Sequence, residues 1–313
     1  MNLLSSMRYL VALSEHRHFG RAAEACGVTQ PALSSALRGL EEEYGVVIVK
    51  RGRQYAGLTR EGEHVLATAQ RILREHGLLQ QELESYEGRP RGPIRIGAVP
   101  TAIPVLSRFA AILQAKHPGI APTVLSLSSP ELETGLESLS LDLALGYTER
   151  IEQRRSTVDA WPQYTEHYFL LRRAATVGTE LHLGAPMAWS DAARLPLALL
   201  TPDMHNRSIV DAAFADVQAD VRPAFETNSV LALAVSVMAG EVCSVMPGAL
   251  VDTVRRYGEL EALPLQEPEV RTPIGFMAAA GLRPSRAMEA ALALLQDAEW
   301  LRHASAHSGL LAG

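Results

Sequence analysis

The chain has 313 residues, of which 47% are hydrophobic and 20% charged, with a formal net charge of −6. This length predicts about two or three domains, each able to bury its own core, and the composition excludes a largely disordered chain. No apolar run approaches the ~20 residues of a membrane span, and the first residues lack the features of a signal peptide, so we expect a cytoplasmic protein.

The charge is distributed unevenly along the chain. Residues 1–60 carry eight Arg and Lys against five Glu, a net charge of +3, so the rest carries −9. This asymmetry indicates a basic module for a polyanion joined to an acidic body, with an ordinary solvated surface as the alternative. The two cysteines, Cys26 and Cys243, are too few for a disulfide framework, and we expect two buried thiols.

The first 45 residues predict a helix-turn-helix. Residues 3–14 and 19–26 are expected to be helical, and Gly27 ends the second helix. Thr29 then provides an N-cap for a third helix, with Pro31 in a first turn that tolerates proline. The helix after such a turn enters the DNA major groove. Helical spacing predicts one buried face for the third helix, formed by Leu33, Leu37, Leu40 and Tyr44.

The opposite face of the third helix is polar, and side chains of these types reach base edges and phosphates; a solvated helix face is the alternative. Residues 46–59 predict a two-stranded wing with a basic tip, which would lie across the DNA backbone or minor groove unless it is merely a solvated hairpin. The candidate DNA-binding residues are Thr29, Gln30, Pro31, Ser34, Ser35, Arg38, Arg51 and Arg53.

Residues 60–88 predict one long helix, capped at its start by Thr59. About 28 residues would span roughly 42 Å, which is too long for a helix inside a small domain. Its seam residues step alternately by four and three, as in a coiled coil, which favours a pairing helix in a homodimer over a helix docked on the C-terminal body. The seam comprises Val65, Ala69, Ile72, His76, Leu79, Leu83 and Tyr86.

Beyond a Gly- and Pro-rich hinge at 89–93, strands alternate with helices, which predicts an α/β fold of two lobes with a mainly parallel sheet and a cleft between the lobes. The expected strands cover 94–99, 120–127, 141–147, 167–173, 195–200, 223–228, 241–247 and 272–280. The expected helices cover 103–116, 130–138, 206–217, 229–239 and a final helix from Pro284 to about Arg302.

The N-terminal stretch resembles the LysR-type transcriptional regulators. The matching positions are Ala22, Ala23, Thr29, Gln30, Pro31, Ser34, Leu40, Glu41, Gly45, Arg51, Leu58, Thr59 and Gly62, in the order and spacing of the family. Three positions depart from it: His18 replaces a usual Ser, Val49 a usual Phe and Ser35 a frequent Arg. Because the last change removes a phosphate or base contact, the preferred DNA sequence does not carry over from relatives.

The resemblance implies a multi-domain protein. Residues 1–59 would form an all-α winged helix-turn-helix domain, 60–88 the linker helix for dimerisation, 89–93 the hinge, 94–303 a two-lobed effector-binding domain similar to periplasmic solute-binding proteins, and 304–313 a tail. Lobe I would cover about 94–163 and 266–303, and lobe II about 164–265.

The implied function is a homodimeric, or preferably homotetrameric, regulator of transcription. It would bind an interrupted inverted repeat in double-stranded promoter DNA and bend it, with RNA polymerase as a further partner and no membrane contact. A small-molecule effector would enter the cleft between the lobes and shift the population of two conformations. Neither cofactor nor metal is expected.

The effector site is expected where helices follow strands, because helix N-termini there offer free N–H groups and a positive dipole end. This chemistry favours a small anion such as a carboxylate, although each hydroxyl could equally be a helix cap and nothing more. Tyr147 and Tyr164 are candidates for stacking against an aromatic effector. The candidate effector-binding residues are Pro100, Thr101, Ser128, Ser129, Thr201, His205 and Asn228.

Three rival interpretations are weaker. An enzyme would carry a catalytic motif, and no GxGxxG, GxxxxGK[ST], GxSxG or HExxH is present. A transport-type binding protein would be exported and would not need a basic N-terminal module. A peroxide-sensing regulator of the same family needs a reactive cysteine pair, whereas Cys26 lies in the expected helical core and Cys243 in an expected strand.

Overall fold

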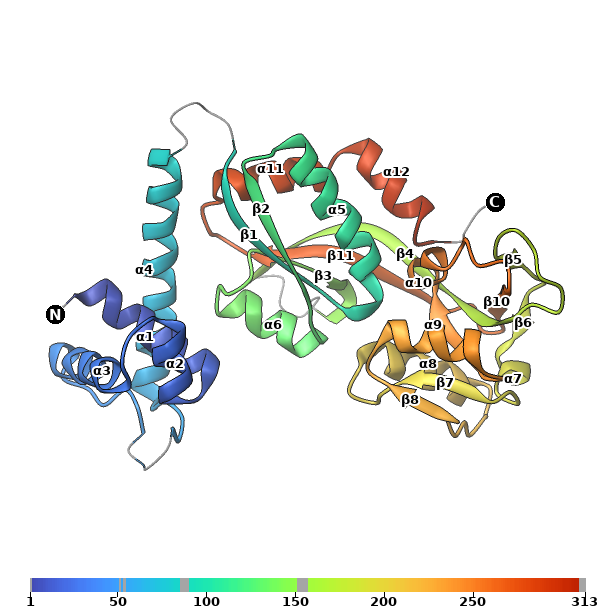
Figure 1. The fold of residues 1–313 in the computed structure, drawn as a ribbon, viewed down its shortest axis with the longest axis horizontal. Helices are drawn as coiled ribbons and strands as arrows, with labels where there is room; N and C mark the ends of the chain where they lie inside the picture. Colours follow the sequence, from blue (N-terminus) through green and yellow to red (C-terminus); the bar gives the residue numbers. More distant parts are fainter. Residues whose placement is uncertain (1, 51, 53–54, 85–89, 151–156, 310–313) are drawn as a thin grey trace. The chain divides into compact units, whose positions relative to one another are not determined.

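A computed structural model describes residues 2–50, 52, 55–84, 90–150 and 157–309 (Figure 1). The chain divides into two compact units, residues 1–87 and 88–313. Each unit has its own hydrophobic core. Within the described ranges, no helix is both long and apolar enough to cross a bilayer.

The N-terminal unit contains the helices α1 (Leu3–His16), α2 (Phe19–Ala25), α3 (Gln30–Tyr44) and α4 (Arg60–Glu84). Its core is built from the apolar faces of these helices, with Leu10, Leu13, Leu33 and Leu40 fully buried. Tyr44 was expected on the buried face of α3, but it is 43% exposed. It is the last residue of the helix, where the chain turns at Gly45 with a positive φ of 66°.

Side chains cap the first three helices. Asn2 Oδ1 accepts a hydrogen bond from the Ser5 amide at 3.2 Å, and Thr29 Oγ1 accepts one from the Ala32 amide at 3.4 Å, so the expected cap of α3 is confirmed. His18 caps α2 through Nδ1, which accepts from the amides of Gly20 at 3.1 Å and Arg21. The histidine therefore performs the capping role for which serine is well suited.

A short wing follows α3. It is paired by an isolated antiparallel bridge between Val49 and Leu58. The Glu41 carboxylate of α3 accepts hydrogen bonds from the amides of Ile48, at 2.7 Å, and Val49, at 3.1 Å, and so fixes the wing to the helix. α4 begins close to the same strand, where a Cβ at Gly62 would collide with the Ile48 carbonyl oxygen.

The C-terminal unit is built on a mixed sheet in the order β2-β1-β3-β11-β4-β9-β7-β8, with β10 pairing β4, β5 and β6. The strands are β1 (Gly92–Ala98), β2 (Ile120–Ser126), β3 (Leu143–Tyr147), β4 (Val158–Arg173), β5 (His182–Leu183), β6 (Met187–Ala188), β7 (Leu197–Leu200), β8 (Phe225–Thr227), β9 (Cys243–Pro247), β10 (Leu260–Gln266) and β11 (Arg271–Ala279). The pairs among β1, β2 and β3 and among β7, β8 and β9 are parallel. The pairs that β4 and β11 make are antiparallel, so the sheet is less uniformly parallel than expected.

The long strand β4 is shared by two lobes. Its residues 158–167 pair with β11, and its residues 168–173 pair with β9 and β10. Lobe I comprises β1–β3, β11 and the first part of β4; lobe II comprises β5–β10 and the last part of β4. Separate hydrophobic clusters fill the lobes, around Phe109 and Phe276 in lobe I and around Phe169 and Trp189 in lobe II.

The helices of the C-terminal unit are η1 (Pro100–Ala102), α5 (Ile103–Lys116), α6 (Ser129–Glu137), α7 (Trp189–Ala192), α8 (His205–Asp216), α9 (Val230–Ala239), α10 (Gly248–Thr253), α11 (Arg286–Leu295) and α12 (Ala298–Ala306). The expectation of one final helix was wrong, because Asp297 starts a new helix by accepting hydrogen bonds from the amides of Glu299 and Trp300. The break lets Trp300 pack on Phe109 and donate to Gln163 Oε1 at 2.6 Å.

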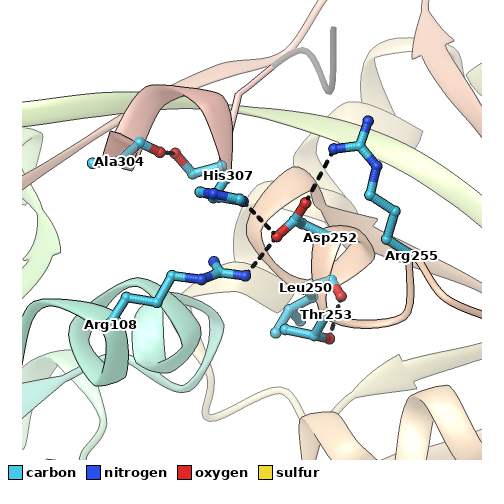
Figure 2. Close-up of polar contacts among 8 residues, drawn as sticks. Arg108, Leu250, Asp252, Thr253, Arg255, Ala304 and His307 are labelled. Carbon is cyan, nitrogen blue, oxygen red and sulfur yellow. Dashed lines mark hydrogen bonds and ion pairs between the residues drawn. The ribbon is translucent and has the colours of Figure 1, made fainter. Parts of the chain in front are cut away.

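A buried carboxylate joins the lobes (Figure 2). Asp252 of α10 has a side chain only 3% exposed, and its Oδ2 lies 2.6 Å from Arg108 Nη2 of α5 and 3.0 Å from His307 Nδ1. Arg255 Nη1 lies 3.6 Å from Oδ1. Asp252 therefore connects α5, α10 and the segment that follows α12.

Candidate DNA-binding and effector-binding sites

The outward face of α3 is accessible. Thr29, Gln30, Pro31, Ser35 and Arg38 are exposed and Ser34 is half-buried. On the opposite side, Leu33, Leu37 and Leu40 anchor the helix to the core. The N-cap and the exposed residues share the leading half of the helix, which is the part that a helix-turn-helix presents to base edges.

A polar hollow of about 770 Å³ lies beside this face. Ser35 and Arg38 of α3 line one side, and Ser5 and Tyr9 of α1 line the other. Sequence reasoning missed the contribution of α1, because these residues carry no motif of their own. In the wing, Lys50 is exposed. The candidates Arg51 and Arg53 lie outside the described residues.

In the C-terminal unit, two of the expected effector residues meet at Tyr147. Thr101 is 1% exposed, and its hydroxyl lies 3.1 Å from the Tyr147 hydroxyl. The ring of His205, the first residue of α8, packs edge-on against the Tyr147 ring at a centroid distance of 4.7 Å. Because Thr101 and Tyr147 belong to lobe I and His205 to lobe II, this cluster lies where the lobes meet.

The surroundings of His205 favour the neutral form of its ring. Burial and the neighbouring Arg150 guanidinium lower its pKa, so the ring is neutral near pH 7. Arg150 itself is paired with Glu133, with 2.8 Å between its Nε and Oε1. Arg207 is likewise paired, with Asp211 at 2.7 Å and Glu226 at 2.6 Å.

The other candidates differ in their availability. Ser128 is occupied as a cap, because its amide and hydroxyl both donate to Glu131 Oε2, at 2.8 and 2.7 Å. Ser129 Oγ and Thr201 Oγ1 are buried without a hydrogen-bond partner. Pro100 begins η1, and Asn228 is exposed beyond the end of β8.

Ser129 and Tyr147 also line one small cavity of about 20 Å³, together with Glu133 and Arg150. The structure thus gathers Thr101, Ser129 and His205 around Tyr147. It provides no such contact for Asn228. A helix N-terminus remains open at α8, where no side-chain cap is made.

Sequence reasoning missed the most unusual group in this region. Glu166 lies in β4 and is 0% exposed, and both of its carboxyl oxygens lack a hydrogen-bond partner. Burial raises its pKa to about 8, while the adjacent Tyr164 hydroxyl acts to lower it. The signal available in the sequence was a lone glutamate inside the β-prone run 164–171, with tyrosines two residues before and after it.

The surroundings of Glu166 are hydroxyl-rich. Tyr164, Glu166 and Tyr168 alternate along β4 and so lie on one face of the sheet. Thr272 of β11 stands opposite Glu166 in the register, and its Oγ1 lies 3.2 Å from the Tyr168 hydroxyl. Asn206 Nδ2, from α8, donates to the same Tyr168 hydroxyl at 3.4 Å.

Neither cysteine is activated. Burial raises the pKa of both thiols, although Arg8 acts to lower that of Cys26 and Arg172 that of Cys243. Cys26 belongs to the N-terminal unit and Cys243 to β9 of the C-terminal unit. A reactive thiol is normally a lowered-pKa thiolate in a partly exposed site. Cys26 is half-buried rather than buried as expected, but neither thiol has a lowered pKa.

Comparison with known proteins gives a consistent result. Residues 4–63 match the family described as bacterial regulatory helix-turn-helix protein, lysR family, and residues 87–300 match the LysR substrate binding domain. The chain is 28% identical over 284 residues to the DNA-binding transcriptional dual regulator OxyR of Escherichia coli K12, covering 88% of each chain. It is 36% identical over 144 residues to a hydrogen peroxide-inducible genes activator of Haemophilus influenzae, covering 45% of this chain and 48% of the relative.

Solved structures agree with this fold. A full-length cysteine-to-aspartate variant of OxyR from Pseudomonas aeruginosa superposes with a TM-score of 0.69 at 26% identity, covering 92% of this chain and 95% of that one. Full-length CbnR in complex with its target DNA gives a TM-score of 0.63 at 19% identity, covering 96% and 99%. With a helix-turn-helix unit and a substrate-binding unit that both match, the chain belongs to the LysR family of DNA-binding transcriptional regulators.

Proposed function

We propose that this regulator binds promoter DNA through the exposed face of α3 and through the wing, and that a small carboxylate bound between lobes I and II alters this binding. The observation that carries the DNA part is the exposure of Gln30, Ser35 and Arg38 on a helix whose other face is fully anchored. Arg51 and Arg53 complete the proposed contact set in the wing. The protein would act in the cytoplasm, without catalytic turnover of its effector.

The assembly is proposed to be a homodimer that pairs further into a homotetramer. Along α4, Ile72 is 38% exposed, Leu79 54% and Leu83 62%. They lie at the seam positions of the heptad pattern, where the same helix of a second copy would cover them. Two α3 helices related by such pairing would reach successive major grooves of an inverted repeat.

The carboxylate part of the proposal rests on groups that donate hydrogen bonds without carrying charge. The uncapped N-terminus of α8 offers backbone N–H groups, and the hydroxyls of Thr101 and Tyr147 lie beside it. The Glu131 carboxylate occupies the start of α6, so an anion is disfavoured there. The site therefore centres on η1 and α8, with Thr201 and Ser129 as further hydroxyl donors.

A direct test begins with the operator. Duplexes selected from a random library by the wild-type chain would give an inverted repeat with two half-sites. Arg38→Ala should weaken binding to that repeat by about 1–3 kcal/mol and leave the melting temperature unchanged. Arg194→Ala, an exposed arginine of the C-terminal unit, is the matched control. Operator affinity equal to wild type in Arg38→Ala would refute the assignment of α3 as the reading helix.

The effector part has its own test. A panel of small mono- and dicarboxylates would be screened by thermal shift on the full chain, and a hit should change operator affinity. A ligand that binds only the folded protein increases the free energy of unfolding by RT ln(1 + [L]/Kd), and the melting temperature rises as a result. A hit that leaves operator binding unaltered at saturation would contradict coupling between the two units.

Peroxide sensing is a second candidate, favoured by the names of the relatives. In this chain a thiol mechanism would have to use Cys26 or Cys243, and burial raises the pKa of both thiols. We therefore propose a response that does not require thiol oxidation. The double variant Cys26→Ser, Cys243→Ser should respond to the effector as wild type does. A peroxide-dependent change in operator binding that disappears in the double variant would establish the thiol mechanism instead.

A further inference from the structure

We propose that Glu166 receives a protonated amine of the effector, so that the ligand is a small amino carboxylate with its two charged ends held by different parts of one site. This inference rests on the effector site proposed above and adds the group that binds the other end of the ligand.

Glu166 is unusual because its carboxyl group is fully buried. An ionised carboxylate without a partner is strongly disfavoured in a protein interior, and buried carboxyl groups normally have hydrogen bonds. Neither oxygen of Glu166 has one of ordinary geometry, although the adjacent Tyr164 hydroxyl interacts with this carboxyl group and acts to lower its pKa. A buried carboxyl group with only a neighbouring hydroxyl to interact with indicates a place that is completed by a ligand.

No described Arg, Lys or His pairs with Glu166. Arg150 is held by Glu133, and Arg207 is held by Asp211 and Glu226. Within the described residues there is also no group of His, Cys, Asp and Glu side chains able to hold a metal ion. We infer that the missing partner is a ligand that carries hydrogen-bond donors and a positive charge able to stabilise the ionised form of Glu166.

An ammonium group fits these surroundings. It offers three donors, and the carboxyl oxygens of Glu166 together with the hydroxyls of Tyr164 and Tyr168 are available as acceptors. The rings of Tyr147, Tyr164 and Tyr168 add faces that attract a cation. A neutral hydroxyl or a second carboxylate would supply no positive charge to stabilise the ionised form of Glu166.

The two ends of the site are adjacent. Asn206, the second residue of α8, donates to the Tyr168 hydroxyl. Burial and, after it, the Glu166 carboxyl group raise the pKa of Tyr147, Tyr164 and Tyr168. The carboxylate of a short ligand at the start of α8 would therefore place its amine near β4. Because Glu166 is 0% exposed, the lobes must part to admit the ligand, and this couples binding to lobe movement.

Ligand binding would also move a proton. Burial raises the pKa of Glu166 to about 8, so the empty site holds a neutral carboxyl group near pH 7. An ammonium ion binds the carboxylate form, so each binding event should release close to one proton. The titratable groups that interact with Glu166 are Tyr147 of β3 and Tyr164 and Tyr168 of β4, whose pKa values are raised by burial and by Glu166.

The experiment uses the full chain, each of the standard L-amino acids, and the matching carboxylic acid without the amine. We expect one amino acid to raise the melting temperature and to bind at least about tenfold more tightly than its deaminated analogue. Titration calorimetry at pH 7 in phosphate and in Tris should give heats that differ by about one proton released. Affinity should rise by about tenfold per pH unit from pH 6 to pH 8.

Glu166→Gln keeps the shape of the side chain and its neutrality in the empty site, so it should fold normally. It should lose the preference for the amino acid and the proton release, whereas the control Glu299→Gln, at an exposed position, should keep both. Equal binding of deaminated acids, or retention of the preference in Glu166→Gln, would overturn the amine contact and leave the carboxylate site standing. If neither class of probe binds, both proposals are wrong.

Discussion

Arg108 of α5 and Asp252 of α10 form the shortest of the described ion pairs to Asp252, at 2.6 Å, and the pair spans the two lobes of the C-terminal unit. Asp252 is nearly inaccessible, whereas the Arg108 side chain is 29% exposed. His307, in the last described segment of the chain, also contacts this carboxylate, with 3.0 Å between its Nδ1 and Asp252 Oδ2. One buried carboxylate thus holds three segments that are far apart in sequence.

Removing this carboxylate should destabilise the C-terminal unit. Asp252→Asn keeps the volume but leaves Arg108, His307 and Arg255 without their common anion. Because the partners are partly exposed, we expect a loss of about 2 kcal/mol in the free energy of unfolding, less than for a fully buried pair. Urea denaturation measures it, with Asp220→Asn in an exposed loop as the control. If Asp252→Asn lost no more unfolding free energy than the control, the ion pairs of Asp252 would not contribute to stability.

Gly62 should be required by the contact between α4 and the wing. A methyl group there would collide with the Ile48 carbonyl oxygen, so Gly62→Ala should cost about 3 kcal/mol through overpacking. Gly77, on the same helix, has open space around its Cβ position, so Gly77→Ala should instead gain about 0.5–1 kcal/mol. Thermal unfolding of both variants compares the two positions directly. Similar effects of the same sign would contradict the proposed collision.

The wing should contribute to DNA binding through charge alone. Lys50 is exposed next to the basic tip, so Lys50→Ala should weaken binding to many sequences alike. The slope of log affinity against log salt concentration should fall by about one. Lys116→Ala, on α5 of the other unit, should leave the slope unchanged. An unaltered slope in Lys50→Ala would remove the wing contact at this residue.

Thr101 should be needed for the effector response. Thr101→Val has nearly the same shape but removes the hydroxyl that meets Tyr147, at a cost of about 1 kcal/mol in stability. The thermal shift caused by the carboxylate hit should vanish while operator affinity without effector stays at the wild-type value. Thr176→Val, at an exposed position, is the control. A full response in Thr101→Val would place the ligand elsewhere.

Glu166 should impose a pH dependence on stability. The folded protein keeps the Glu166 proton up to a pKa of about 8, whereas the unfolded chain loses it near 4.5. Folding therefore retains a proton in this window, and the contribution of Glu166 to stability falls as pH rises from 4.5 to 8. Glu166→Gln should thus be more stable than wild type by about 3 kcal/mol at pH 7.

The difference between Glu166→Gln and wild type isolates this contribution. His205 and His303 have lowered pKa values, so they act oppositely and reduce stability as pH falls below about 6.5. Because these histidines are present in both proteins, their effect cancels in the comparison. Urea denaturation at pH 5, 6, 7 and 8 should show a difference that grows with pH. A constant difference would mean that Glu166 is ionised in the folded protein.

Local features of the sequence were sufficient for the N-terminal unit. The cap at Thr29, the buried positions Leu33, Leu37 and Leu40, and the polar face between them depend on residues a few positions apart. The expected long helix after Thr59 is also present, with the Gly62 amide donating to Thr59 Oγ1 at 2.9 Å. Capping and helical periodicity are short-range effects, and a single sequence therefore displays them.

The residues that meet in the effector region are determined by the tertiary structure. Glu166 is unusual because β11, β3 and α8 bring Thr272, Tyr147 and Asn206 around it, and several of these contacts join segments more than about a hundred residues apart. The break at Asp297 likewise depends on Trp300 finding Phe109 in α5. The sequence by itself determined which helices form and which face of α3 stays free, because those choices are made within a few turns of chain. Whether an ionisable side chain is buried, and which groups then lie within hydrogen-bonding distance of it, depends on how distant strands pack together.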